Sequence, residues 1–432
     1  MSPDAAYWTA FAQWAAGDLA PGPVAVERAE NALIDTVACI IAGEATPAAR
    51  AASALGDGMA AEAFRLATSG HAVELDDYDR PSVSHPSTVL VPVVLAVARY
   101  RPVSGAAAVQ AFVAGLEAMD RMGEAVNPAH YERGWHATGT LGQLGAAVTA
   151  GRLFRLDGVQ MLNAMAIAIS AAASLKGQFG SMGKPLHAGF AAMNGIQAAL
   201  LAGAGADGRV ETLLSFAELF GPEAPQPLRP FGDPLAIEEF GLVVKLWPCC
   251  GYLGRIVPRV LDLAARIAPT DISQIDVEMP ARNLAVAGFG WPSKVDEARF
   301  SAPYCIAAAL TDKALTVAHF TEAAIGRADL KALAAKIETR AAAVQNSPVD
   351  LSAADPDRIT VKLTDGSRID HLCATLPGSP ETPASRTALF EKLHDAMPKG
   401  QSAREASLTT LLAAPAELAD LSPVSLLLEA AR

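Results

Sequence analysis

The sequence has few cysteines and few aromatic residues. Its 432 residues include 5 cysteines, at positions 39, 249, 250, 305 and 373, and aromatic residues make up 6% of the chain. The cysteines form no CxxC pair and their number is odd, which argues against a disulfide scaffold and against a compact zinc or iron–sulfur motif. We therefore expect no metal, and a reducing cytoplasm is the simplest compartment.

Positive charge is scarce as well. The chain has 34 Lys and Arg against 46 Asp and Glu, a net charge of −12. Such a surface repels phosphate backbones and anionic lipids, so neither nucleic acid nor a membrane is an expected partner. Two nearly uncharged stretches, 158–175 and 188–206, are interrupted by Gly, Asn, Gln or Ser, which favours buried helices over membrane spans. The N-terminus carries Asp4 and no basic region, unlike a secretory signal peptide.

What the chain has in abundance is small apolar side chains. Hydrophobic residues account for 51%, mostly Ala and small aliphatics, which favours closely packed helices. Helical patterns cover residues 10–19, 26–44, 48–55 and almost all of 87–206. The GxGxxG at 203–208 follows a helical pattern rather than a strand, so it predicts a helix end and a turn instead of a dinucleotide site.

The pattern changes after about residue 260. Residues 272–280 alternate like a strand, and residues 358–373 alternate around Asp365-Gly366, which predicts a hairpin. Residues 321–341 read as one amphipathic helix, and residues 384–431 return to helix. The sequence therefore predicts a mainly α protein, with a large helical domain at 1–260, a smaller α+β domain at 261–390, and a helical tail at 391–432 that can pack back on the first domain.

Four segments interrupt the apolar helical sequence with polar residues. Each places a histidine or lysine where we expect the start of an apolar helix, where unpaired N–H groups and the helix dipole favour an anion. If these helix starts converge, they form a pocket for carboxylates in which histidines move protons. The residues concerned are Asp76, Asp77 and His85 before a helix starting near Ser87, His136 before an expected N-cap at Thr138, Lys184 and His187 around Pro185, and Lys245 before a further helix.

Each of these residues also has a structural interpretation. A single histidine near a helix start is more often structural than catalytic, and lysines are usually solvated. The aspartates at 76, 77 and 79 could cap helices or lie in a solvated loop. Cys249 and Cys250 are expected to be packing residues, since a vicinal disulfide would be strained. The recurrence of four such interruptions in a nearly uncharged stretch favours the functional interpretation.

The ordered set of segments resembles the MmgE/PrpD family, which includes 2-methylcitrate dehydratase, cis-aconitate decarboxylase and iminodisuccinate epimerase. The resemblance implies a helical domain formed by both chain ends, an inserted α+β lid, a cofactor-free homodimer and an active site between the two domains. It places Asp76, Asp77, His85, His136, Lys184, Lys245 and Tyr304 at family active-site positions. The segments are IDTVACIIAG, HAVELDDYD, SHPSTVLVPVVLAVA, GWHATGTLGQLGAAVTAGRLFRLDG, KPLHAGFAAMNGIQAALLA, KLWPCCGYLGRIV and RFSAPYCIAAAL.

The resemblance leaves the reaction open. Its first implication is a cofactor-independent lyase that dehydrates a methylcitrate-like hydroxy-polycarboxylate. In such an enzyme the lysines bind the small anionic substrate, and a histidine moves the proton next to a carboxylate. Epimerisation or decarboxylation of a related dicarboxylate would use the same site and the same enolate-like intermediate. A non-catalytic dicarboxylate-binding scaffold is the alternative from another class.

Overall fold

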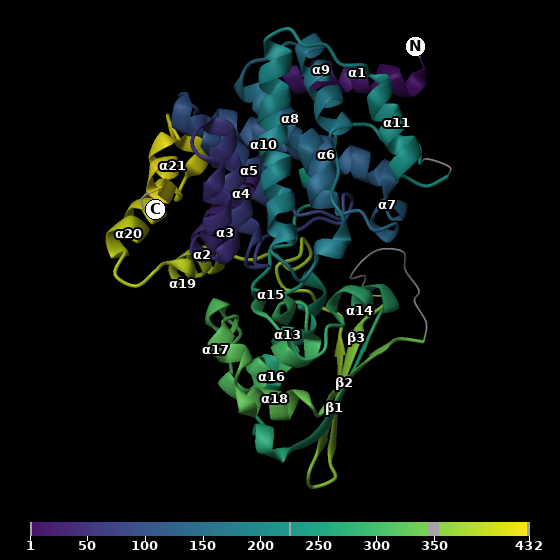
Figure 1. Ribbon diagram of the computed structural model, residues 1–432, viewed down its shortest axis with the longest axis vertical. Helices are drawn as coiled ribbons and strands as arrows, with labels where there is room; N and C mark the ends of the chain where they lie inside the picture. Colours follow the sequence, from purple (N-terminus) through teal and green to yellow (C-terminus); the bar gives the residue numbers. More distant parts are fainter. Residues whose placement is uncertain (1, 224–225, 344–353, 430–432) are drawn as a thin grey trace.

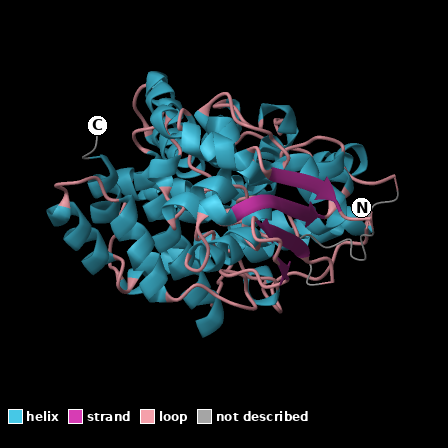
Figure 2. Ribbon diagram, turned by 90° about the horizontal axis from the view of Figure 1, so that it is seen from below, coloured by secondary structure: helices cyan, strands magenta, loops and turns pink. Residues whose placement is uncertain are grey.

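A computed structural model describes residues 2–223, 226–343 and 354–429. Within these ranges the chain is mainly helical and has one four-stranded sheet. Helices fill most of the molecule, and the sheet lies at the end opposite α1 and α9 (Figures 1 and 2). The mainly α class predicted from the Ala-rich composition is confirmed.

The larger, helical part contains segments from both ends of the chain. Their apolar residues form one buried cluster that extends from Trp8 to Ile237 and resumes from Leu389 to Leu428. The elements are α1 (Pro3–Ala16), α2 (Pro23–Gly43), α3 (Pro47–Ala52), α4 (Met59–His71), α5 (Ser87–Tyr100), α6 (Gly105–Val126), α7 (Ala129–Glu132), α8 (Ala137–Leu153), α9 (Gly158–Ser170), α10 (Gly183–Gly203), α11 (Glu211–Phe220), α12 (Ala236–Glu239), α19 (Arg386–Ala396), α20 (Ser402–Leu411) and α21 (Ser422–Glu429).

Local sequence signals set many of these helix boundaries. The helices α1, α2 and α3 each have proline in the first turn, where its missing N–H costs nothing. At the start of α9, Asp157 and Gln160 form a capping box. The helix α10 ends at Gly203 and the following Gly205 has φ +98°, so the GxGxxG segment is the helix end and turn that the sequence predicts.

The smaller part of the molecule is built on the sheet. A second buried apolar cluster extends from Cys249 to Cys373, below the helical part in Figure 1. The strands of the sheet lie in the order β2-β1-β3-β4, with β1 and β2 parallel and the other pairs antiparallel. The elements are α13 (Ile256–Ala264), β1 (Ile272–Met279), α14 (Ala281–Ala287), α15 (Val295–Ala298), α16 (Ala302–Asp312), α17 (Glu322–Ile325), α18 (Ala328–Ala334), β2 (Ile337–Ala341), β3 (Asp357–Leu363) and β4 (Arg368–Cys373).

Two sequence predictions in this part are confirmed and one is wrong. The strand β1 and the β3–β4 hairpin lie where alternation predicts them, and Gly366 in the hairpin turn has φ +87°. The single helix predicted over 321–341 is instead α17, α18 and the strand β2. Strand pairing explains the difference, because β2 lies parallel to β1 with Ile337 opposite Ile275. This tertiary contact outweighs the helical periodicity of the segment.

The two apolar clusters support a division into two domains. We propose that both chain ends belong to the helical domain and that the smaller domain includes α13, so that its first boundary lies near residue 249 rather than the predicted 260 and its second near the predicted 390. Among the described helices, no single one is long and apolar enough to span a membrane, although α2 and the Pro47–Leu55 segment pass the test together across a 91° bend.

Candidate functional site

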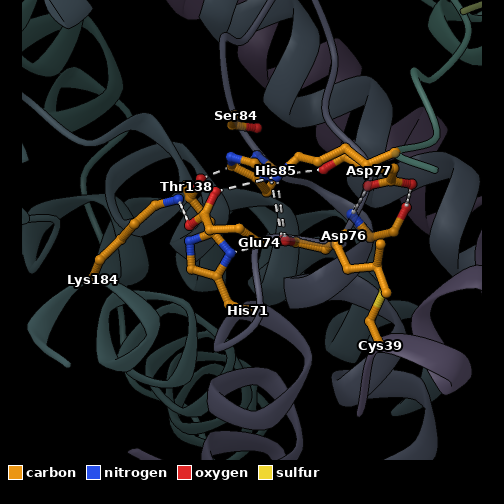
Figure 3. A network of polar contacts seen from close by, with 12 residues as sticks. Cys39, His71, Glu74, Asp76, Asp77, Ser84, His85, Thr138 and Lys184 are labelled. Carbon is orange, nitrogen blue, oxygen red and sulfur yellow. Dashed lines mark hydrogen bonds and ion pairs between the residues drawn. The ribbon is translucent and has the colours of Figure 1, made fainter. Parts of the chain in front are cut away.

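The predicted site residues lie around one cavity, with the exception of Tyr304. The loop between α4 and α5 carries Glu74, Asp76, Asp77 and His85, which meet His71 and Lys184 in a buried polar network (Figure 3). The cavity has a volume of about 70 Å³ and is open to solvent. Of the predicted residues, His85, His136 and Lys184 line it, while Asp76, Asp77 and Lys245 do not line it but contact His85 or Glu74 of its lining.

A glutamate that the sequence analysis did not single out joins the two predicted lysines. The Glu74 carboxylate forms an ion pair with Lys184 through Oε1 and lies 3.2 Å from Lys245 Nζ through Oε2, and all three side chains are buried. Burial alone would raise the pKa of Glu74, but Lys184 and Lys245 outweigh it and hold the pKa below its usual range. Both lysines therefore already hold a carboxylate of the protein itself, which makes the pocket far less basic than the sequence predicts.

The Asp76 carboxylate is the acceptor for two histidines, His71 and His85. Its Oδ2 lies 2.7 Å from His71 Nδ1 and 3.3 Å from His85 Nδ1, and its Oδ1 lies 3.7 Å from Lys245 Nζ. Burial would raise the pKa of Asp76, but the histidines and Lys245 outweigh it and keep the carboxylate ionised. His71 was not among the predicted residues, although it stands in the quoted HAVELDDYD segment.

The surroundings of His85 fix its tautomer. Its Nδ1 faces two groups that only accept hydrogen bonds, the Asp77 carbonyl oxygen at 2.8 Å and the Asp76 carboxylate. The proton of the neutral ring must therefore sit on Nδ1, which leaves Nε2 unprotonated. Burial lowers the pKa of His85, so the neutral form dominates near neutrality. A neutral imidazole that lines a cavity with a bare Nε2 has the properties of a general base.

His136 begins α8 and lines the same cavity. It is the N-cap residue of this helix, so the predicted N-cap at Thr138 is wrong by two residues. Thr138 instead lies within α8, and its hydroxyl oxygen accepts the backbone N–H of His85 at 3.0 Å. The His136 ring stacks on His71 with centroids 5.6 Å apart, and its Nδ1 lies 2.9 Å from Nδ1 of His187. Burial lowers the pKa of His136 well below its usual value.

Asp77 and the helix α19 hold the loop between α4 and α5 in place. The Asp77 carboxylate accepts the hydroxyl of Ser87 at the start of α5, and burial together with Asp35 raises its pKa. From α19, Lys392 Nζ donates to the carbonyl oxygens of Leu75 at 2.6 Å and Lys245 at 3.1 Å, and it pairs with Asp35 at 2.5 Å. One ammonium group thus fixes the positions of both the acidic loop and the Lys245 segment.

Two predicted features of the site do not hold. Tyr304 lies in the second apolar cluster, where its hydroxyl donates to the His319 carbonyl oxygen at 2.5 Å, and it does not line the cavity. Its segment forms the buried helix α16, which turns the ring toward Trp291 and Phe320. Lys245 does not begin a helix, because the next element is a 3₁₀ turn at Gly251–Leu253 and α13 starts only at Ile256.

The cavity also contains side chains that the sequence does not mark as site residues. Cys250 lines it as a neutral thiol, since burial raises its pKa to about 12. Tyr78 and Arg80 line it as well, and the Arg80 guanidinium pairs with Glu381 at 2.6 Å. Within the described part of the chain, His71, Asp76 and His85 are the group with metal-ligand character, with ligand atoms within 4.8 Å of one another.

The buried histidines make the stability of the protein depend on pH. Burial lowers the pKa of His71 to about 4, whereas the unfolded chain titrates near 6.5. Between these values the unfolded state binds more protons, so the free energy of unfolding falls as the pH drops from 6.5 toward 4. We expect urea denaturation at pH 7 and pH 5 to show that His71→Gln removes about 2 kcal/mol of this loss. An equal pH dependence in His71→Gln, in the control His371→Gln on β4 and in the wild type would contradict the assignment.

Comparison with known proteins places these residues in a family. The MmgE/PrpD N-terminal domain matches residues 58–221, and the MmgE/PrpD C-terminal domain matches residues 247–413. The chain is 28% identical to a cis-aconitate decarboxylase of Homo sapiens over 340 residues, which cover 74% of this chain and 69% of that protein. It is 25% identical to a cis-aconitate decarboxylase of Aspergillus terreus over 390 residues, covering 80% and 79% of the two chains. The two domain matches cover most of the chain in the expected order, and the protein belongs to the MmgE/PrpD family.

Proposed function

We propose that this protein is a cofactor-independent lyase that decarboxylates a small unsaturated di- or tricarboxylate of the cis-aconitate kind. The observation that carries the proposal is the pair of neutral histidines, His85 and His136, on one cavity with the Glu74–lysine group in its wall. Dehydration is the first reaction that the resemblance of the sequence implies. The cis-aconitate decarboxylases among the relatives now favour decarboxylation.

The proposed chemistry uses the lysines to stabilise charge and a histidine to move a proton. Loss of CO₂ leaves an electron pair on the substrate carbon, which spreads onto a neighbouring carboxylate as an enolate. Each lysine ammonium has three N–H donors, and Glu74 takes only part of this capacity. The remaining donors of Lys184, which lines the cavity, can bind the substrate carboxylate, and a histidine then protonates the carbon.

Proton transfer without loss of CO₂ is the second candidate. The bare Nε2 of His85 is suited to remove a proton next to a carboxylate, and His136 could return it, which is the chemistry of epimerisation or dehydration. Cis-aconitate, methylcitrate and iminodisuccinate, each supplied in D₂O and followed by NMR and CO₂ release, separate these reactions. Saturable binding of all three with neither turnover nor deuterium exchange would support a binding scaffold instead.

The histidine pair gives the most direct test by mutation. His136→Gln should lower kcat on the active substrate by about 10²- to 10⁴-fold, because it removes the group that protonates the carbon. His85→Gln should cause a loss of this size only if the reaction begins with removal of a proton, because the bare Nε2 of His85 has no proton to donate. Steady-state kinetics of both variants is the measurement, with circular dichroism to check folding. His394→Gln, on the exposed side of α19, is the matched control and should keep full activity. Full turnover by His136→Gln would contradict the proposed function.

We also propose that the protein is a homodimer in the cytoplasm. Supporting this, α10 exposes a row of apolar side chains, Phe190, Leu200 and Leu201, and its one charged residue, Lys184, is buried. An uncharged face lets two copies of an acidic chain meet without repulsion. Light scattering should give twice the monomer mass, and Phe190→Glu should reduce it. A monomeric wild type at micromolar concentration would contradict the proposal.

A further inference from the structure

The two ring nitrogens of His136 have unequal surroundings. Its Nε2 is buried and has no hydrogen-bond partner within the described residues, although the ring lines the cavity. Its Nδ1 lies 2.9 Å from Nδ1 of His187, in the second turn of α10. One nitrogen thus has no hydrogen-bond partner within the described residues, and the other is committed to a second histidine.

This arrangement limits how His136 can act as an acid. Burial, reinforced by His71 and Lys184, lowers the pKa of His136 well below its usual value, so the ring is neutral and carries one proton. A neutral imidazole that gives away its only proton becomes an imidazolate anion, which burial would make very unfavourable. His136 can therefore protonate a substrate at Nε2 only if Nδ1 gains a proton in the same step.

His187 is the group placed to supply that proton. Two nitrogens 2.9 Å apart share a single hydrogen, which belongs to one ring or to the other. With the hydrogen on His187 Nδ1, the His136 proton sits on Nε2 and His136 is an acid toward the cavity. With the hydrogen on His136 Nδ1, its Nε2 is bare and the residue is a base. The position of one hydrogen thus decides the role of His136.

His187 also has a connection to solvent that His136 lacks. Its side chain is partly exposed on α10, whereas His136 is only 2% exposed. The aromatic ring of Phe179 packs edge-on against His136 with centroids 5.0 Å apart, and His71 stacks on its face. When a substrate fills the cavity, protons can therefore reach His136 most directly through the His187 ring.

We propose that His187 is a positioning residue that relays a proton from solvent to His136. The relay rests on the decarboxylation proposed above. As the bond to the leaving carboxylate breaks, CO₂ departs and the electron pair stays on the substrate carbon. That carbon takes the proton of His136 Nε2, His136 Nδ1 takes the proton of His187 Nδ1, and His187 Nε2 takes a proton from water. Each turnover consumes one solvent proton and releases one CO₂, so both rings return to the neutral state after a tautomer change.

An asparagine at position 187 separates the relay from a purely structural role. The Asn amide can keep a hydrogen bond to His136 Nδ1, but it cannot pass a proton through its side chain. We expect His187→Asn to lower kcat about 100-fold with KM changed by less than threefold. Imidazole added to His187→Ala should restore part of the lost rate. Gln197→Ala, exposed on the same helix, is the control. Unchanged kcat in His187→Asn, or no rescue of His187→Ala by imidazole, would overturn the relay.

A second measurement tests the shared hydrogen without any substrate. In the ¹⁵N NMR spectrum of the histidine-labelled wild type, one of the two Nδ1 atoms should be protonated and coupled to the other across the hydrogen bond. The coupling should disappear in His187→Asn. If both rings carry their proton on Nε2, no hydrogen lies between them and the relay is wrong. A wild type with this coupling but no turnover would reject the proposed function and leave the proton sharing intact.

Discussion

The ion pairs of Glu74 with Lys184 and Lys245 are the interaction on which the site depends. The glutamate comes from the loop after α4, one lysine from the first turn of α10 and the other from the segment before α13. Two buried ammonium groups without a carboxylate would carry a large desolvation cost, so each partner allows the others to be buried. Glu74, Lys184 and Lys245 therefore join three distant segments and fix the wall of the cavity.

The rest of the loop is shaped around this group. Glu74 and Val83 both have positive φ, 53° and 52°, conformations that cost energy for residues with a Cβ. Packing and hydrogen bonds hold the loop in this form, including the Asp76 contacts to His71 and His85 and the Lys392 bonds to Leu75 and Lys245. Because Lys392 belongs to α19, the C-terminal segment takes part in positioning residues from the first half of the chain.

Net charge alone does not describe such a site. The overall charge of −12 predicts that an anion needs a concentrated basic pocket. The structure gathers the lysines but balances them with Glu74 and Asp76, so recognition depends on hydrogen-bond donors of the lysines rather than on excess positive charge. This arrangement favours a small anion that reaches those donors directly.

Sequence periodicity predicts the parts of the molecule in which local pattern and tertiary packing agree. The helices, the hairpin at Asp365-Gly366 and the positions of His85, His136 and Lys184 at helix starts follow from local signals. Glu74 and His71 escape such reasoning because their roles depend on a loop with unusual backbone angles, for which no period exists. The strand β2 and the buried position of Tyr304 depend on contacts with distant segments, so a local pattern misleads there.

Binding of a small tricarboxylate to Glu74→Gln tests this account most directly. Isothermal titration of tricarballylate into the wild type, Glu74→Gln and the surface control Glu338→Gln on β2 compares the lysine pair with and without its internal carboxylate. Removing the Glu74 charge should make Glu74→Gln bind tricarballylate at least about tenfold more tightly than the wild type, because the ligand then compensates both lysines. Equal or weaker binding by Glu74→Gln would show that Lys184 and Lys245 do not receive the substrate carboxylate.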